Sequence, residues 1–162
     1  MYRRSLFHIS VLICNLLFLT SAFAQSDQSS VDRGRYLITI AGCNDCHTAG
    51  YPESGGKVPE FQWLKGSPIG YQGPWGTTYP ANLRLSVANM SEEQFIARSR
   101  SELMPPMPWF NLVAMSDQDL KAMYAYIKSL GEPGEEVPAY VPPDIAPVTP
   151  YIVFVPQQPA RH

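Results

Sequence analysis

Cys43-Asn44-Asp45-Cys46-His47 is the most informative run of residues in this 162-residue chain. Two thiols three residues apart lie on one turn of a helix, where both can reach the vinyl groups along one side of a porphyrin. The imidazole of the next residue then falls beneath the iron. The run therefore predicts one covalently attached haem c, bound through Cys43 and Cys46, with His47 as the proximal axial ligand.

Two other readings of the same run can be weighed against the rest of the chain. A thioredoxin-like redox pair needs a βαβ context, and no buried hydrophobic strands flank the cysteines. A structural zinc site needs four ligands. Beyond residue 24 the only histidine other than His47 is His162, at the end of the chain. Both alternatives are weaker than haem attachment.

The sixth ligand of the iron can be sought by elimination, because haem iron in an electron carrier usually has histidine or methionine on its second face. The terminal position of His162 argues against a second histidine. Five methionines follow Met1, and three of them have packing explanations. Met90 and Met115 each precede a predicted helix N-cap, Ser91 with a capping box to Gln94 and Ser116. Met123 lies on an apolar stripe at helical spacing.

Met104 and Met107 remain, in the segment Leu103-Met104-Pro105-Pro106-Met107-Pro108-Trp109. Prolines on both sides of Met107 restrict its backbone and exclude a helix, so the segment is expected to be a stiff loop. Such a loop can hold a thioether at a fixed point over the iron. Met107 is the predicted sixth ligand, and Met104 is the main alternative. If Met107 has no role in ligation, it is expected only to fill a gap beside Trp109.

The remaining pattern predicts a small all-α domain whose apolar core is largely the haem. Helices are expected over Val31 to Ala41, about Glu92 to Arg100 and about Asp117 to Leu130, the last ended by Gly131. The stretch Thr48 to Leu85 is rich in glycine and proline and has no sustained period. It is expected to be loop rather than sheet.

Residues 1–24 have the features of a cleaved secretory signal peptide. Arg3 and Arg4 precede an apolar run, and Ala22-Phe23-Ala24 fits a cleavage site. The apolar run is shorter than the roughly 20 residues of a membrane-spanning helix, although an uncleaved anchor is the alternative. Cleavage would leave 10 basic against 14 acidic residues, which argues against a nucleic-acid partner. A periplasmic or otherwise exported protein is expected.

The C-terminal residues 132–162 differ from the rest. Eight prolines from Pro133 to Pro159 exclude a helix or a central strand. Residues such as Tyr140 and Phe154 are nevertheless more apolar than a free end needs. Extended proline-rich chain loses little entropy on docking, so this segment, called the tail below, is expected to lie against a partner subunit or against its own domain.

With these residues in place, the chain resembles the class I cytochrome c family, and more closely the small monohaem cytochromes found beside periplasmic dehydrogenases. The resemblance covers about residues 31–131, with the tail as a departure. It rests on Gly34 to Leu37, Cys43 to Thr48, Gly73 to Asn82, Pro105 to Trp109, Ser116 to Leu120 and Tyr124 to Tyr126. It implies that His47 and Met107 ligate the iron and that the first and last helices cross. It also makes Trp75, Tyr79 and Asn82 candidates for contact with the haem edge or propionates.

The function expected from this reading is one-electron transfer without substrate chemistry. Histidine on one face and methionine on the other let the iron change oxidation state without releasing a ligand. The expected partners are redox proteins, with a dehydrogenase as donor and an oxidase or another cytochrome as acceptor. Membrane association would come only through partners or an uncleaved signal. The alternatives are a haem enzyme or gas sensor with an open sixth position, and a fixed subunit of a dehydrogenase complex.

Overall fold

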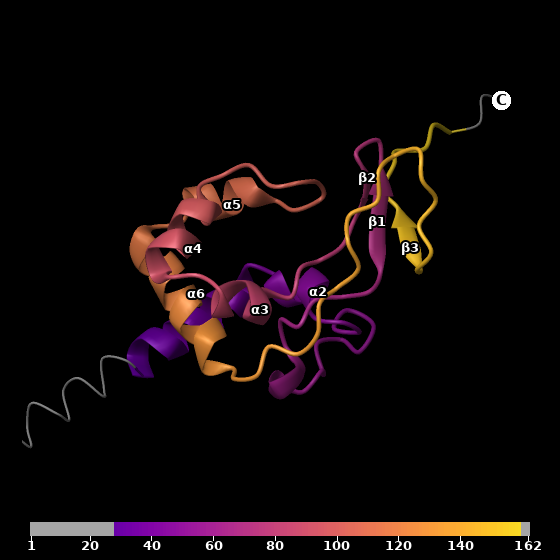
Figure 1. Ribbon diagram of the computed structural model, residues 1–162. Helices are drawn as coiled ribbons and strands as arrows, with labels where there is room; N and C mark the ends of the chain where they lie inside the picture. Colours follow the sequence, from indigo (N-terminus) through magenta and orange to yellow (C-terminus); the bar gives the residue numbers. More distant parts are fainter. Residues whose placement is uncertain (1–27, 160–162) are drawn as a thin grey trace, which may run out of the picture.

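The computed structural model describes residues 28–159, so the predicted signal peptide and His162 lie outside the described residues. A group of helices forms one part of the molecule and a small sheet lies beside it (Figure 1). In chain order the elements are a helix at residues 28–40, α2 (Cys43–His47), the 3-10 helix η1 (Glu60–Gln62), β1 (Gly70–Gly73), β2 (Gly76–Thr78), α3 (Leu83–Ala88), α4 (Glu92–Ser99), α5 (Trp109–Ala114), α6 (Asp117–Ser129) and β3 (Tyr151–Val153).

The first and last helices cross in close contact at Gly34. A Cβ built on Gly34 would overlap the carbonyl oxygen of Ala122 and lie 2.6 Å from the Cβ of Tyr126. Only glycine allows the two backbones to approach so closely. Helix α6 starts where the sequence predicts, with the Ser116 hydroxyl accepting from the amide of Asp119. It ends before Gly131, which has the left-handed φ of 79° expected of a C-terminal cap.

The buried core lies along α6 and the helices that pack on it. Helix α6 contacts α3 and α4, and its Leu120, Met123 and Ile127 are buried as the helical spacing predicts. Helix α4 has the predicted capping box between Ser91 and Gln94. The largest fully buried side chains of the domain include Ile38, Leu64, Val87, Leu120, Tyr126 and Ile127.

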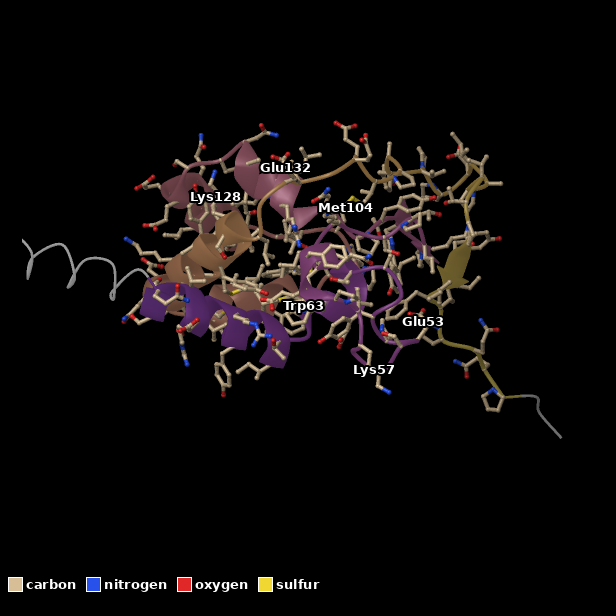
Figure 2. All side chains as sticks on the ribbon, turned by 90° about the horizontal axis from the view of Figure 1, so that it is seen from below. Glu53, Lys57, Trp63, Met104, Lys128 and Glu132 are labelled. Atoms are coloured by element: carbon tan, nitrogen blue, oxygen red, sulfur yellow. The ribbon has the colours of Figure 1, made fainter. Side chains whose placement is uncertain are left out.

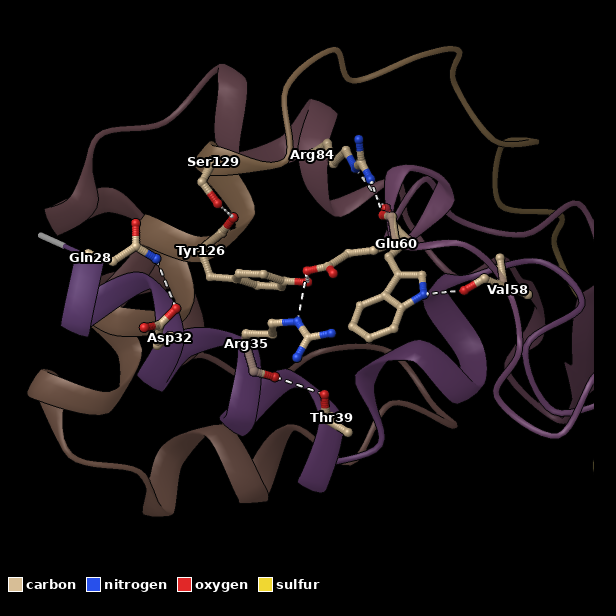
Figure 3. Close-up of polar contacts among 10 residues, drawn as sticks. Gln28, Asp32, Arg35, Thr39, Val58, Glu60, Arg84, Tyr126 and Ser129 are labelled. Carbon is tan, nitrogen blue, oxygen red and sulfur yellow. Dashed lines mark hydrogen bonds and ion pairs between the residues drawn. The ribbon is translucent and has the colours of Figure 1, made fainter.

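A polar network joins the first helix, η1 and α6 on one side of this core (Figure 3). Glu60 accepts a hydrogen bond from Arg35 at 2.9 Å and from the Tyr126 hydroxyl at 2.7 Å. Arg84 lies buried beside it and donates to the carbonyl oxygens of Glu60, Trp63 and Leu130. One guanidinium thereby satisfies three carbonyls from two separate segments.

The expectation of loop over Thr48 to Leu85 is wrong in part. Strands β1 and β2 form an antiparallel hairpin in which Tyr71 pairs with Thr78 and Gly73 with Gly76. Strand β3 of the tail then pairs in parallel with the other edge of β1. These strands have only three or four residues, too few for a period to stand out in a glycine-rich sequence. The short helices α3 and α5 also escape the sequence analysis.

The tail lies against its own domain, one of the two positions that the sequence left open. From Glu132 the chain leaves the helical part and runs across to β3 at the sheet (Figures 1 and 2). None of the helices in residues 28–159 combines the length and the apolar character that a membrane crossing requires.

Candidate haem site

A cavity of about 340 Å³ lies between α2 and α3 on one side and the loop of residues 103–108 on the other. That volume falls within the roughly 300–1,000 Å³ typical of small-molecule and cofactor sites. Most of the lining side chains are apolar. They include Leu83, Val87, Phe95, Leu103, Leu112, Met123 and Ile127.

Helix α2 brings Cys43, Cys46 and His47 to one wall of this cavity. Both thiols are free, with no disulfide between them. Burial raises the pKa of the Cys43 thiol to about 12, so this sulfur is protonated at neutral pH. No group of three or more His, Cys, Asp or Glu side chains in the described chain could hold a metal ion. Both thiols line the largely apolar cavity, as thioether formation with a porphyrin requires.

His47 is buried and its ring is oriented by the backbone. Nδ1 lies 2.7 Å from the carbonyl oxygen of Ala81, which can only accept, so Nδ1 carries the hydrogen. Nε2 then keeps its lone pair in the neutral ring. Desolvation lowers the pKa of His47, which favours that neutral form. A backbone carbonyl on the second ring nitrogen is the usual way to orient a metal-ligating histidine.

The loop between α4 and α5 brings both candidate methionines to the same cavity. Met104 is 46% exposed, and Figure 2 shows it between the helical part and the sheet. Met107 is less exposed. The loop is fastened to the hairpin by the Thr78 hydroxyl, which donates to the carbonyl oxygen of Pro105 at 2.7 Å.

Two of the methionines assigned to packing also line the cavity. Met123 is 2% exposed on α6 and Met90 precedes α4, and both lie at the wall. Met115 packs against the core and is not among the lining residues. Met123 lies on α6, and Met90 lies in the short connection between α3 and α4.

Of the three candidates for contact with the haem edge or propionates, only Tyr79 lines the cavity. Tyr79 lines the cavity and its hydroxyl shares a hydrogen bond with Thr149. Asn82 does not line it: its amide donates to the carbonyls of Pro133 and Glu135, and its oxygen caps α3. Trp75 packs on Phe154 away from the lining. The Trp75 indole nitrogen is buried without a hydrogen-bond partner, so a contact of Trp75 or Asn82 with the haem edge stays a prediction.

Several lining residues were missed by the sequence analysis, among them Tyr71, whose hydroxyl donates to Cys46 Sγ at 3.7 Å. Arg98 brings a positive charge to the cavity, and its position three residues after Phe95 on α4 is a signal that could have found it. Pro138 and Tyr140 belong to the tail, and no local pattern places them at the cavity.

The residues present fit a covalently attached haem. Free thiols and a neutral, backbone-oriented imidazole lie on one wall, thioethers lie on a loop that also lines the cavity, and apolar side chains fill the rest. Cysteine thiols, an axial imidazole, an axial thioether and an apolar pocket are the features by which proteins bind haem c.

The family model for cytochrome c matches residues 31–131. The chain is 32% identical over 121 residues to the fructose dehydrogenase cytochrome subunit of Gluconobacter japonicus. The matched region covers 68% of this chain and 23% of that protein. It is 28% identical over 131 residues to the gluconate 2-dehydrogenase cytochrome c subunit of Pantoea cypripedii, covering 73% and 27%. The chain thus spans about a quarter of the length of these relatives. No solved structure gives a significant match.

Proposed function

Because this chain belongs to the cytochrome c family of haem-binding electron carriers, we propose that it carries one haem c attached to Cys43 and Cys46, with His47 and Met107 as axial ligands. One observation carries the proposal. A single apolar cavity is lined both by the three residues of α2 and by the proline-flanked methionine loop.

Each of these residues has a distinct task in this proposal. Haem, when bound, supplies the one-electron couple. His47, oriented by the carbonyl of Ala81 at 2.7 Å, offers Nε2 to the iron. Met107 offers a thioether that favours the reduced state relative to a second histidine. Met107 is preferred over Met104 because it is less exposed and has proline on both sides.

The electron donor in this proposal is a dehydrogenase, and the acceptor is an oxidase or another cytochrome. The relatives support this, since their names describe cytochrome subunits of dehydrogenases. Substrate oxidation then belongs to the partner, and this chain transfers electrons outside the cytoplasm. The proposed organisation is a signal peptide at 1–24 that is removed, a cytochrome domain at 25–131 and a tail at 132–162. A large dehydrogenase subunit that co-purifies with the tagged chain would identify a fixed subunit.

The axial ligand is tested by visible spectra of the purified, oxidised and reduced protein, with and without carbon monoxide. The wild type is expected to show a sulfur-to-iron charge-transfer band when oxidised and to bind no carbon monoxide when reduced. Met107→Ala is expected to lose that band and to bind carbon monoxide. Met104→Ala, in the same loop, is the matched control and is expected to behave as the wild type.

A reversed pattern, with only Met104→Ala losing the band, would transfer the ligand role to Met104. A high-spin wild type that binds carbon monoxide readily would overturn the electron-carrier assignment and favour a haem enzyme or gas sensor. Covalent attachment is checked separately by the mass of the denatured chain, which exceeds the polypeptide mass by one haem.

A further inference from the structure

We infer that the tail is a wall of the haem site, in which Pro138 and Tyr140 close the cavity against water and the neighbouring backbone braces the methionine loop. The inference rests on the proposed haem attachment and deepens it. The tail lies beyond residues 31–131, the part of the chain that the family model matches.

The lining of the cavity is the first observation. Pro138 and Tyr140 line the same cavity as Cys46, His47 and Met107. Tyr140 is fixed there, because its hydroxyl donates to the carbonyl oxygen of Trp75 at 2.7 Å. A bulky ring held at one point and half exposed is suited to cover the edge of an apolar ligand.

Hydrogen bonds to the backbone of the tail hold it on both sides of these two residues. Before them, the Asn82 amide donates to the carbonyls of Pro133 at 2.7 Å and Glu135 at 2.9 Å. After them, Val141 and Thr77 exchange two backbone hydrogen bonds of 2.8 and 3.0 Å. Further on, β3 pairs with β1. The segment is therefore fastened at three places and not at one.

Two glycines of the domain leave the room that the tail fills. A Cβ on Gly66 would overlap the side chain of Val137. A Cβ on Gly76 would overlap the carbonyl oxygen of Val141 and lie 2.9 Å from the Tyr140 hydroxyl. Both glycines have positive φ, 82° and 99°. A Cβ on Gly66 would also meet the domain's own backbone at Pro80 and Asn82, whereas the close contacts at Gly76 are all with the tail.

The tail is also linked to the methionine loop through β2. Val141 pairs with Thr77, and the next residue, Thr78, donates to the carbonyl of Pro105 at 2.7 Å. Pro105 lies two residues before Met107. Loss of the tail removes one side of β2's pairing and so loosens the strand that anchors the loop.

Two consequences follow for a bound haem. Excluding water from the cavity favours the reduced state, because burial in an apolar shell raises the reduction potential. A braced loop keeps the methionine sulfur in place and closes the sixth position to small ligands. The tail therefore raises the reduction potential and keeps the methionine ligand in place.

The test compares three variants of the haem-loaded protein with the wild type: a chain ending at Gly131, Tyr140→Ala and the control Val148→Ala. Val148 is in the tail but is 98% exposed. Redox titration and carbon monoxide binding are measured. The shortened chain is expected to have a lower potential and, when reduced, to bind carbon monoxide, which the wild type does not. Tyr140→Ala is expected to shift both in the same direction by less, and Val148→Ala to match the wild type.

The inference fails if the shortened chain, with its haem attached, keeps the potential and the carbon monoxide behaviour of the wild type. If the shortened chain does not accumulate, Tyr140→Ala decides alone, and an unchanged potential then overturns the inference. Failure of the proposed function is distinguishable, because the mass of the wild-type chain would then show no covalent haem.

Discussion

The helical core and the tail are held in place by different forces. The core is made of buried side chains, such as Leu120 and Ile127 on α6, and its stability comes mainly from apolar burial. In the tail, the β3 side chains are about half exposed, and its backbone is attached mostly by hydrogen bonds with the backbones of β1 and β2 and with the side-chain amide of Asn82. Segments with few buried contacts open locally before the whole fold does, so damage to the two regions should be separable.

The largest effect is expected at the helix crossing in the core. Gly34→Val places side-chain atoms where the Ala122 carbonyl and the Tyr126 Cβ lie. The two helices must then separate, at a cost of about 3 kcal/mol in the free energy of unfolding. Thermal or urea unfolding measures this loss. The control Ile40→Ala, on the exposed face of the same helix, should change stability by less than about 0.5 kcal/mol. A mild effect of Gly34→Val would mean that the crossing is looser than described.

Arg84→Lys should have the next largest effect. The guanidinium reaches the carbonyls of Trp63 at 2.7 Å, Leu130 at 2.6 Å and Glu60 at 3.0 Å. An ammonium group cannot reproduce that planar set of donors. Buried carbonyls left without donors should cost about 2 kcal/mol, measured by urea unfolding. Arg33→Lys, which keeps an exposed ion pair with Asp119, should cost less than about 1 kcal/mol. Equal losses in both variants would contradict the special role of Arg84.

Gly76→Ala tests the tail without touching the core. The new Cβ collides with the Val141 carbonyl at a φ of 99°, so the tail must move, at about 1–2 kcal/mol. Hydrogen exchange is expected to accelerate at the amides of Val141 and Phe154 and to stay unchanged in α6. Gly50→Ala is the matched control, since Gly50 has a φ of 74° and nothing within 4 Å. Acceleration throughout α6 would show that tail and core are one cooperative unit.

The smallest effect is expected from the charge of Glu60. The hydrogen bond from Arg35, and after it that from Tyr126, lowers the pKa of this carboxyl. A lowered folded-state pKa gives stability that is present above the unfolded pKa of roughly 4.3 and is lost as pH falls through the folded pKa. Glu60→Gln should reduce the loss of unfolding free energy between about pH 5 and pH 3 by less than about 1 kcal/mol, seen as a smaller fall in melting temperature over that range. Glu102→Gln, on the exposed surface, should leave that fall unchanged.

The elements with strong local signals were predictable. Helix α6 has a hydroxyl cap at Ser116 and a glycine after its last turn, and α4 has a complete capping box. Each signal depends on residues within about four positions of one another. The hairpin was missed because its strands are short and glycine-rich. Helix α5 was missed because its N-cap, Pro108, makes no side-chain hydrogen bond.

The sequence by itself determined the chemistry of this protein, and the tertiary structure decided its surroundings. The spacing of Cys43, Cys46 and His47 points to haem because those residues act from a single turn of helix. Only the fold decided that the tail lines the cavity, that the Asn82 amide donates to the tail, and that Arg98 faces the site. These contacts join residues tens of positions apart, so a local sequence pattern cannot predict which distant segment packs at a given surface.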